Sequence, residues 1–365
     1  MAQYLHKFDT ESAFNAAYNG SDYDEPWVSY TDETEGQEHV NYNKTEYEKL
    51  RGTPLTFEVI SDGDIIFDRH NTSTSSARTM YYKVNGGEEV SVTVNTATSL
   101  TIHVVSGDVV EFYATNAGYA DRLTPSNRFS FSGTTCGFNL KGNIMSIINR
   151  NSFRTLETIS TASTAGRTFP GLFEYCTGLT NADKLVVPIK TLGMGTMTGW
   201  FKGCPSLRTS PDLSHIETIG EYAFQGFFNG CGNLLKAPEL PWTALTNQCY
   251  TSMFGNCTSL TEAPALPAIT LAQSCYSSMF YGCTGITKAP DLPAEVLAKY
   301  CYQYMFQNCS NLNYVKCLAT DISASSSHSS WLSGVAATGT FVKKAGSTWP
   351  SGVSGIPDGW TVQEI

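Results

Sequence analysis

The sequence predicts a mostly β protein with short helices. An N-terminal arm and an antiparallel β-sandwich-like domain come first, followed by a solenoid of repeats and a β-rich C-terminal cap. Two observations predict the solenoid: a proline-containing phrase recurs with a fixed period, and cysteines keep the same interval. A repeat this short cannot bury its own apolar face, so its copies must stack. A third observation, short runs of alternating apolar and polar residues, predicts the sandwich.

The composition favours a β-rich extracellular or virion-type protein over a cytosolic enzyme. Only 15% of the 365 residues are charged, and 12% are aromatic. The net charge of −10 argues against nucleic acid as a partner. Most of this charge lies between Asp9 and Lys49, where 11 acidic residues and 2 lysines give a balance of −9. Such an arm is either a solvated spacer or a docking segment for a basic partner.

Residues 1–50 form the predicted docking arm. A short capped helix is expected at 9–18, and two strands are expected at 27–30 and 40–43. Their aromatic residues can bury little within so short a segment, so we expect them to pack on another domain or chain. The candidate docking residues are Trp27, Tyr30 and Tyr42. No signal-like or membrane-spanning apolar run is seen, which predicts synthesis in the cytoplasm and no membrane insertion.

Residues 51–148 form the predicted sandwich-like domain. Its expected strands are 55–60, 65–67, 80–84, 90–94, 99–105, 109–114, 128–131 and 138–140. Asn85-Gly86-Gly87 predicts a tight hairpin turn, because asparagine and glycine accept positive φ. A spacing of about ten residues per strand is typical of an antiparallel sandwich or jelly roll.

Residues 149–318 form the predicted solenoid, and residues 319–365 its cap. The repeated phrase, Leu/Ile-x-x-Ala-Pro-x-Leu-Pro, occurs at 234–241, 260–267 and 286–293. Its prolines exclude a helix and favour a sheet without a full ladder of hydrogen bonds. The stretch 271–280 is expected to form a short helix or 3₁₀ turn on the opposite face. About six coils at ~5 Å each predict a length of ~30 Å, and the cap would protect the last unpaired edge.

The cysteines are interpreted as free, buried, small apolar residues that stack on their own copies. Disulfides and a zinc site are the alternatives, but the chain has 11 cysteines, and intervals of 8 and 18 do not resemble closely paired zinc ligands. We therefore expect no metal and no cofactor. The predicted structural ladder consists of Cys231, Cys257, Cys283 and Cys309, with Cys249, Cys275 and Cys301.

The sequence contains no G-x-S-x-G elbow, P-loop or H-E-x-x-H motif, so we expect no enzyme. Binding is instead expected at outward positions of the coils. One candidate row flanks the inward leucines and alanines: Lys236, Glu262 and Lys288. A second row follows the ladder cysteines: Tyr250, Tyr276 and Tyr302. Tyrosine offers flat apolar area and a hydroxyl group; alternatively, these rings only cover the coil edge.

Repeated Phe-x-x-Cys-x-x-Leu/Ile units carry a resemblance to a known family. They occur at 201–207, 254–260 and 280–286, and Ile-Glu-Thr-Ile-Gly-Glu-Tyr-Ala-Phe occupies 216–224. Residues 140–365 resemble the BspA-like leucine-rich-repeat proteins of gut and oral anaerobes, including Bacteroides and their phages. The first fifty residues resemble structural proteins of Bacteroides phages and mobile elements. The resemblance implies a leucine-rich-repeat solenoid with a β-rich C-terminal cap.

The resemblance implies a non-enzymatic, adhesive function. The first interpretation is a phage fibre or decoration protein on the virion surface, docked to a capsid or tail protein by its arm. Its solenoid would bind a bacterial surface protein, a polysaccharide or other glycan, or a mucosal ligand. The alternatives are a bacterial cell-surface adhesin of a gut anaerobe and an intracellular protein-interaction scaffold. A homo-oligomer is compatible with each.

Overall fold

The computed structural model describes residues 6–8, 27–31, 38–42, 44–70, 77–95, 97–115, 128–159 and 169–365. Strands are the main regular elements of these ranges, accompanied by one short α-helix and one 3₁₀ helix. This confirms a β-rich protein. The helix expected at 9–18 lies outside the described residues.

The first three strands form one sheet. They are β1 (His6–Phe8), β2 (Trp27–Thr31) and β3 (Glu38–Tyr42). β1 runs parallel to β2, and β2 runs antiparallel to β3 with Trp27 opposite Tyr42. The two strands expected in the arm are therefore confirmed.

Helix α2 (Lys44–Gly52) follows this sheet and was missed by the sequence analysis. Its first turn carries Glu46 and its last turn carries Lys49 and Arg51, charges that favour the helix dipole. Arg51 donates a hydrogen bond to Glu157 at 2.8 Å, and Lys190 contacts the same carboxylate at 2.8 Å. These two cations lower the pKa of Glu157 through hydrogen bonds, and the contact ties α2 to the repeats.

The next strands form the head, defined here as β4 to β11. They are β4 (Leu55–Val59), β5 (Gly63–His70), β6 (Arg78–Val84), β7 (Val90–Val94), β8 (Leu100–Val104), β9 (Val109–Ala114), β10 (Arg128–Ser130) and β11 (Phe138–Asn143). All eight expected strands are confirmed. One sheet has the order β12-β11-β4-β9-β6-β7, where β12 is Leu179–Val186 from the repeats, and the other has the order β10-β5-β8. Asn85 and Gly86, with φ of 53° and 69°, form the expected tight turn after β6.

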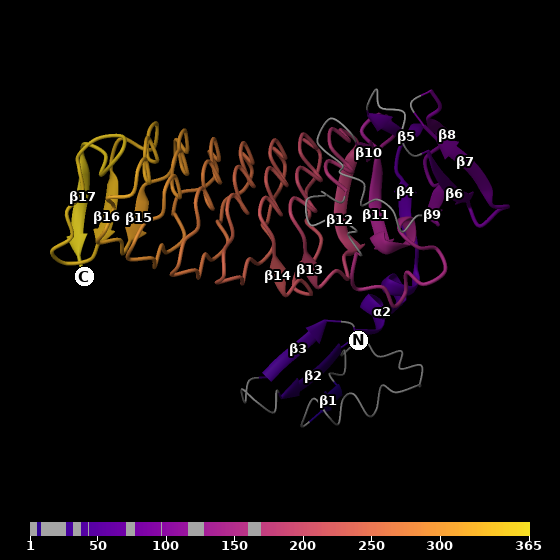
Figure 1. Ribbon diagram of the computed structural model, residues 1–365, viewed down its shortest axis with the longest axis horizontal. Coiled ribbons are helices and arrows are strands. Elements are labelled where there is room, and N and C mark those ends of the chain that lie inside the picture. Colours follow the sequence, from indigo (N-terminus) through magenta and orange to yellow (C-terminus); the bar gives the residue numbers. More distant parts are fainter. Residues whose placement is uncertain are drawn as a thin grey trace, which may run out of the picture.

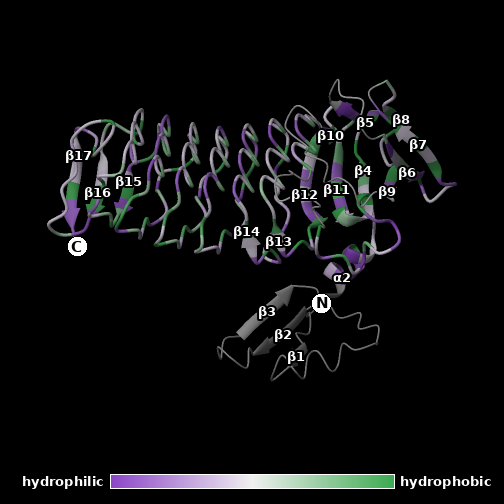
Figure 2. Ribbon diagram, in the orientation of Figure 1, coloured by the Kyte–Doolittle hydropathy of each residue, from purple (hydrophilic) through white to green (hydrophobic). Residues whose placement is uncertain are grey.

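Alternating side chains of these strands build the core of the head. In β8, Leu100, Ile102 and Val104 are buried while the residues between them are exposed. Phe57 of β4 stacks on Phe138 of β11 with ring centroids 4.5 Å apart. Figure 2 shows the alternation of hydropathy along the head strands and around the coils.

The head continues directly into the repeats. After the 3₁₀ helix η1 (Ile144–Ile147), strand β12 (Leu179–Val186) pairs in parallel with β11. A single hydrophobic core runs through both regions. Head and repeats therefore share a sheet and a core.

The repeats stack coil upon coil along the long axis of the molecule (Figure 1). One side of each coil is extended and carries short parallel pairings. These are β13 (Thr191–Leu192) with β14 (Thr218–Ile219), isolated bridges such as Ala244–Thr270, and the sheet β15 (Tyr314–Cys317), β16 (Gly339–Lys343) and β17 (Trp360–Glu364). The prolines of the repeated phrase explain the sparse ladder, because proline has no N–H to donate.

The other side of each coil is a run of consecutive turns. Alternate N–H groups donate to the next coil, as from Tyr250 to the carbonyl of Cys275 at 3.0 Å. The intervening N–H groups close turns within their own coil, and every fourth residue adopts positive φ, as Ser252 does at 54°. The helix or 3₁₀ turn expected at 271–280 is therefore wrong. That segment's hydrogen bonds are shared between coils, and its φ signs do not fit a helix.

Stacked aromatic rings fill the interior of the coils. A phenylalanine ladder runs from the head into the last coils with ring centroids 5.4–5.7 Å apart: Phe131, Phe173, Phe201, Phe228, Phe254, Phe280 and Phe306. The neighbouring Met253, Met279 and Met305 are fully buried.

Candidate functional site

The predicted tyrosine row belongs to the core. Tyr250, Tyr276 and Tyr302 are each 1% exposed, and their rings stack at 5.8 and 6.1 Å. Burial raises the pKa of Tyr250 well above its ordinary value. The prediction that these rings form an exposed row for ligands is wrong. The sequence does contain a signal for this burial, the spacing Cys-Tyr-x-x-Met-Phe-x-x-Cys. Apolar pairs recur in it every four residues, because the turns point pairs of side chains inward.

The cysteine ladders are buried and contain free thiols, as predicted. Their role differs from that of plain apolar fillers. Each thiol of the first ladder donates to a phenylalanine carbonyl of the preceding coil, as Cys257 does to Phe228 at 3.2 Å and Cys283 to Phe254 at 2.9 Å. Each such carbonyl also accepts an N–H within its own coil, so the thiol engages its second lone pair. The second ladder runs beside the tyrosines, where Cys301 points at the carbonyl of Ser327 from 3.7 Å.

The predicted row of charged residues is exposed. It lies on the proline face, which we define as the outward residues of segments 235–246, 261–272 and 287–298. Lys236, Glu262 and Lys288 all lie on it. Lys236 and Glu262 come from adjacent coils and line one hollow of about 380 Å³ together with prolines and alanines. Lys288 instead lies over the ring of Tyr314, with Nζ 5.1 Å from the ring centroid. The structure thus brings two of the three predicted charges together.

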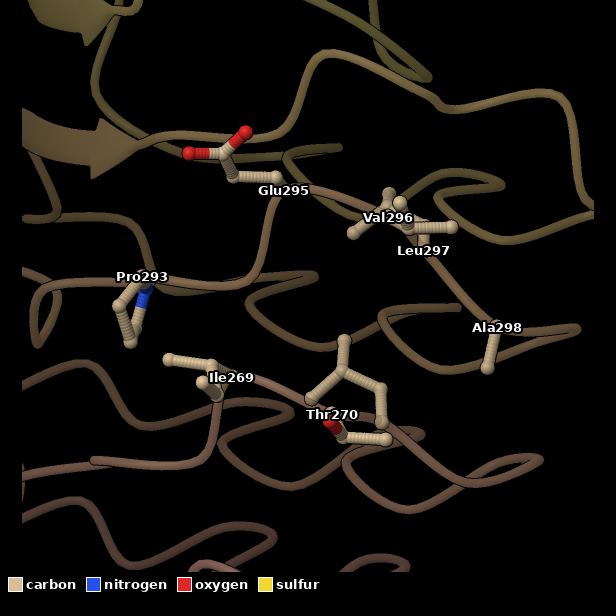
Figure 3. Close-up of a pocket in the computed structure, with 8 residues that line it drawn as sticks. Ile269, Thr270, Pro293, Glu295, Val296, Leu297 and Ala298 are labelled. Atoms are coloured by element: carbon tan, nitrogen blue, oxygen red, sulfur yellow. The ribbon is translucent and has the colours of Figure 1, made fainter.

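Similar hollows occur between other coils. One of about 450 Å³ lies between Thr243 and Ile219 of the coil that precedes the proline face, and one of about 480 Å³ lies between Ile269 and Val296. Figure 3 shows the second, with Ile269 and Thr270 on one coil and Glu295 and Val296 on the next. Each hollow is a groove between two neighbouring coils.

Two exposed aliphatic side chains make the groove of Figure 3 apolar: Ile269 is 69% exposed and Val296 60%. Leu235, 52% exposed, lies on the proline face outside the three grooves. Sequence patterns did not point to Ile269 or Val296, because the equivalent residues of neighbouring coils are polar, such as Glu295 and Thr270. Large apolar side chains that meet in a solvent-facing groove are unusual for a surface that meets only water.

Acidic and basic groups surround the grooves. Lys316 Nζ contacts Asp291 at 2.7 Å, and Lys344 Nζ contacts Glu295 at 2.7 Å. The hydrogen bond to Asp291 raises the pKa of Lys316. Because both signs are interleaved, the proline face is not a uniform field for nucleic acid or a membrane.

The predicted docking residues Trp27, Tyr30 and Tyr42 lie on β2 and β3, and their side chains are outside the described part of the structure. Among the described residues, no three histidine, cysteine, aspartate or glutamate side chains cluster to hold a metal ion. In the same ranges, none of the helices has the length and apolar character needed to cross a membrane.

The repeats match a known family. The BspA type leucine rich repeat region matches residues 123–229 and 225–335, which together cover more than half of the chain. Comparisons with curated proteins and with solved structures give no match. The match leaves out the first 122 residues, so the resemblance of that part to phage structural proteins stays a prediction. The family match, together with the stacked coils of the structure, shows that this chain belongs to the BspA type leucine-rich-repeat family.

Proposed function

We propose that the chain is a non-enzymatic, adhesin-like binding protein that holds a partner protein on its proline face. A β-sandwich-like head and a leucine-rich-repeat solenoid would provide the scaffold. The observation that carries the proposal is the recurrence of grooves between neighbouring coils on one side of the repeats, one of them lined by the exposed Ile269 and Val296. The BspA type repeats support a role in protein interaction or adhesion.

The chemistry of the proline face favours a protein as the partner. Exposed aliphatic residues surrounded by interleaved charges match the anatomy of protein interfaces, which have an apolar centre and a polar rim. Three grooves between successive coils suit an extended partner better than one small molecule, which binds in a single concave pocket. The rings stacked beneath the face make it rigid, so binding there would need little ordering of the chain.

An array of purified secreted and cell-surface proteins tests this function. The fluorescently labelled chain should bind a subset of spots, and the double variant Ile269→Glu, Val296→Glu should lose at least about tenfold in affinity, because each charge must be desolvated in the interface. Tyr304→Ser is the matched control, since Tyr304 is exposed on the turn side. Equal losses in both variants, or no loss in the double variant, would contradict binding by the proline face.

Attachment through residues 1–50 forms a separate part of the proposal. The acidic balance of this arm and its aromatic strands support docking to another protein. A capsid or tail protein would make the chain a virion fibre or decoration protein, and a bacterial envelope would make it a surface adhesin. Mass spectrometry of gradient-purified particles separates the two. Stoichiometric peptides from the particles support the virion assignment, and recovery only from the envelope overturns it.

A further inference from the structure

A polar trough lies on the turn side of the first coils. Its volume is about 330 Å³, and its floor is formed by one row of residues, Gly171, Gly199, Gly226 and Ser252. Charged and amide side chains form its walls, and among the described residues that line it Pro170 is the one with a non-polar side chain. This lining contrasts with the aliphatic groove of Figure 3.

The trough arises because three successive coils lack a side chain at an equivalent position. Gly171, Gly199 and Gly226 each donate their N–H to the next coil in the same way. Farther along, the same position holds Ser252, Ser278 and Tyr304, with φ of 54°, 55° and 57°. The fold therefore accepts a serine or a tyrosine here, and the three glycines leave a hollow.

One wall of the trough is a fixed carboxylate. Glu174 pairs with Arg128 of β10, and Lys202 Nζ lies 3.0 Å from its second oxygen. The side chain of Glu174 is only 8% exposed, so two cations hold it in one orientation. Among the described side chains of this wall, two cations, Arg128 and Lys202, face the one carboxylate of Glu174.

The other wall carries two planar amides, Gln225 and Asn229. Asn229 Nδ2 reaches the carbonyl of Ser252 at 3.5 Å, which leaves its oxygen as an acceptor. Beside the trough, Tyr175 is 51% exposed, and Lys202 Nζ lies 5.5 Å from its ring centroid. The ring of Tyr175 packs against Gly203, and a Cβ added at Gly203 would lie 2.3 Å from the nearest ring atom.

We propose that this trough binds a saccharide unit of a glycan. A sugar presents several hydroxyl groups, each both donor and acceptor, and fixed carboxylate, guanidinium, ammonium and amide groups supply complementary partners. The exposed ring of Tyr175 adds a flat apolar platform for the C–H face of a sugar. The two cations beside Glu174 favour a sugar that carries a carboxylate. The site lies on a different side of the coil from the grooves proposed for a protein partner, and it does not depend on them.

Saturation-transfer NMR with the full chain tests this proposal. The probes are galactose, mannose, N-acetylglucosamine, glucuronic acid and galacturonic acid, each at millimolar concentration. The variant Gly226→Tyr fills the trough with a residue that the fold already accepts at position 304. Ser278→Tyr places the same residue in the same row, away from the trough, and is the matched control. Gln225→Ala is a milder second variant, because its side chain lies at the trough wall.

We expect transfer to at least one sugar, stronger for the two uronic acids, in the native chain and in Ser278→Tyr. Gly226→Tyr should lose at least tenfold in affinity, and Gln225→Ala several-fold. Transfer that survives in Gly226→Tyr, or none to any of the five sugars, would overturn the proposal. If Gly226→Tyr does not fold, Gln225→Ala decides: unchanged affinity overturns the site, and a several-fold loss supports it.

Discussion

The thiol groups of the repeats combine two functions within one small side chain. The regular recurrence of cysteine was enough to predict burial, because identical residues in stacked coils lie above one another. The hydrogen bond from Cys257 to the carbonyl of Phe228 could not be predicted, since that acceptor lies in the preceding coil, far away along the sequence. The tyrosines are a second example. Their periodic recurrence could be read from the sequence, but only the geometry of the turns shows that their rings lie in the core.

Buried thiols predict loss of stability at alkaline pH. Burial raises the pKa of Cys136, in the head, to about 11 and that of the ladder residue Cys231 to about 12, and it also raises the pKa of ladder residues such as Cys257 and Cys283. Below pH ~9 each thiol is protonated in both states, and its full contribution to stability is present. Above that pH the unfolded chain ionises first, so each such thiol lowers the free energy of unfolding by about 1.4 kcal/mol per pH unit until its folded pKa is reached.

Thermal unfolding under reducing conditions, from about pH 8 to about pH 11, measures this effect. The transition temperature should be level at first and then fall steeply above pH ~9. A level transition temperature across the range would show that the thiols are not protected by the fold.

The positive φ of Ser274 predicts a large effect for one substitution and a small effect for another. Ser274 has φ of 55°, and its N–H donates to the carbonyl of Lys299 at 3.0 Å. A β-branched residue is strained in this region, so Ser274→Val should lower the free energy of unfolding by about 1–3 kcal/mol. Ser274→Gly should leave it within about 1 kcal/mol of the native value. Urea denaturation measures both, and a native-like midpoint for the valine variant would argue against the left-handed turn.

The head strands were the most predictable elements, because alternation of apolar and polar residues is a local signal. The turn segments were not predictable in the same way. In 274–283, alternate N–H groups donate to the next coil, so the sequence within the segment does not reveal its hydrogen bonds. Helix α2 was missed because its short polar sequence, Lys44–Gly52, lacks an apolar periodicity. The apolar groove formed by Ile269 and Val296 depends on which side chains adjacent coils expose, which the period alone does not specify.

The joint between head and repeats predicts a sensitive glycine. A Cβ at Gly178 would lie 2.2 Å from the carbonyl oxygen of Cys136, next to the pairing of β11 with β12. Gly178→Ala must push the two elements apart, and we expect a loss of about 1–3 kcal/mol in the free energy of unfolding. Gly232→Ala is the control, because its nearest contact would be Thr258 Oγ1 at 3.6 Å. Similar stabilities of the two variants in urea would contradict the close packing at this joint.

One hydrophobic core unites the head with the repeats, and this continuity makes the proline face a rigid surface. The phenylalanine ladder begins at Phe131 in the head and reaches Phe306 near the last coil. In repeat proteins each coil is stabilised by its neighbours. Here the head covers the first coil, and the β15–β16–β17 sheet follows the last. The fixed period of the repeated phrase predicted this stacking, whereas the shared sheet of β11 and β12 emerged only from the structure.

We claim that a protein partner binds on the proline face, and lysine acetylation footprinting measures whether it does. The native chain is acetylated alone and in complex with a protein that it binds on the array, and each lysine is quantified by mass spectrometry. Lys236 and Lys288 lie on the proline face, whereas Lys202 lies on the turn side and is 43% exposed. We predict that the partner protects Lys236 and Lys288 and leaves Lys202 unchanged. Protection of Lys202 without protection of the other two would contradict the claim.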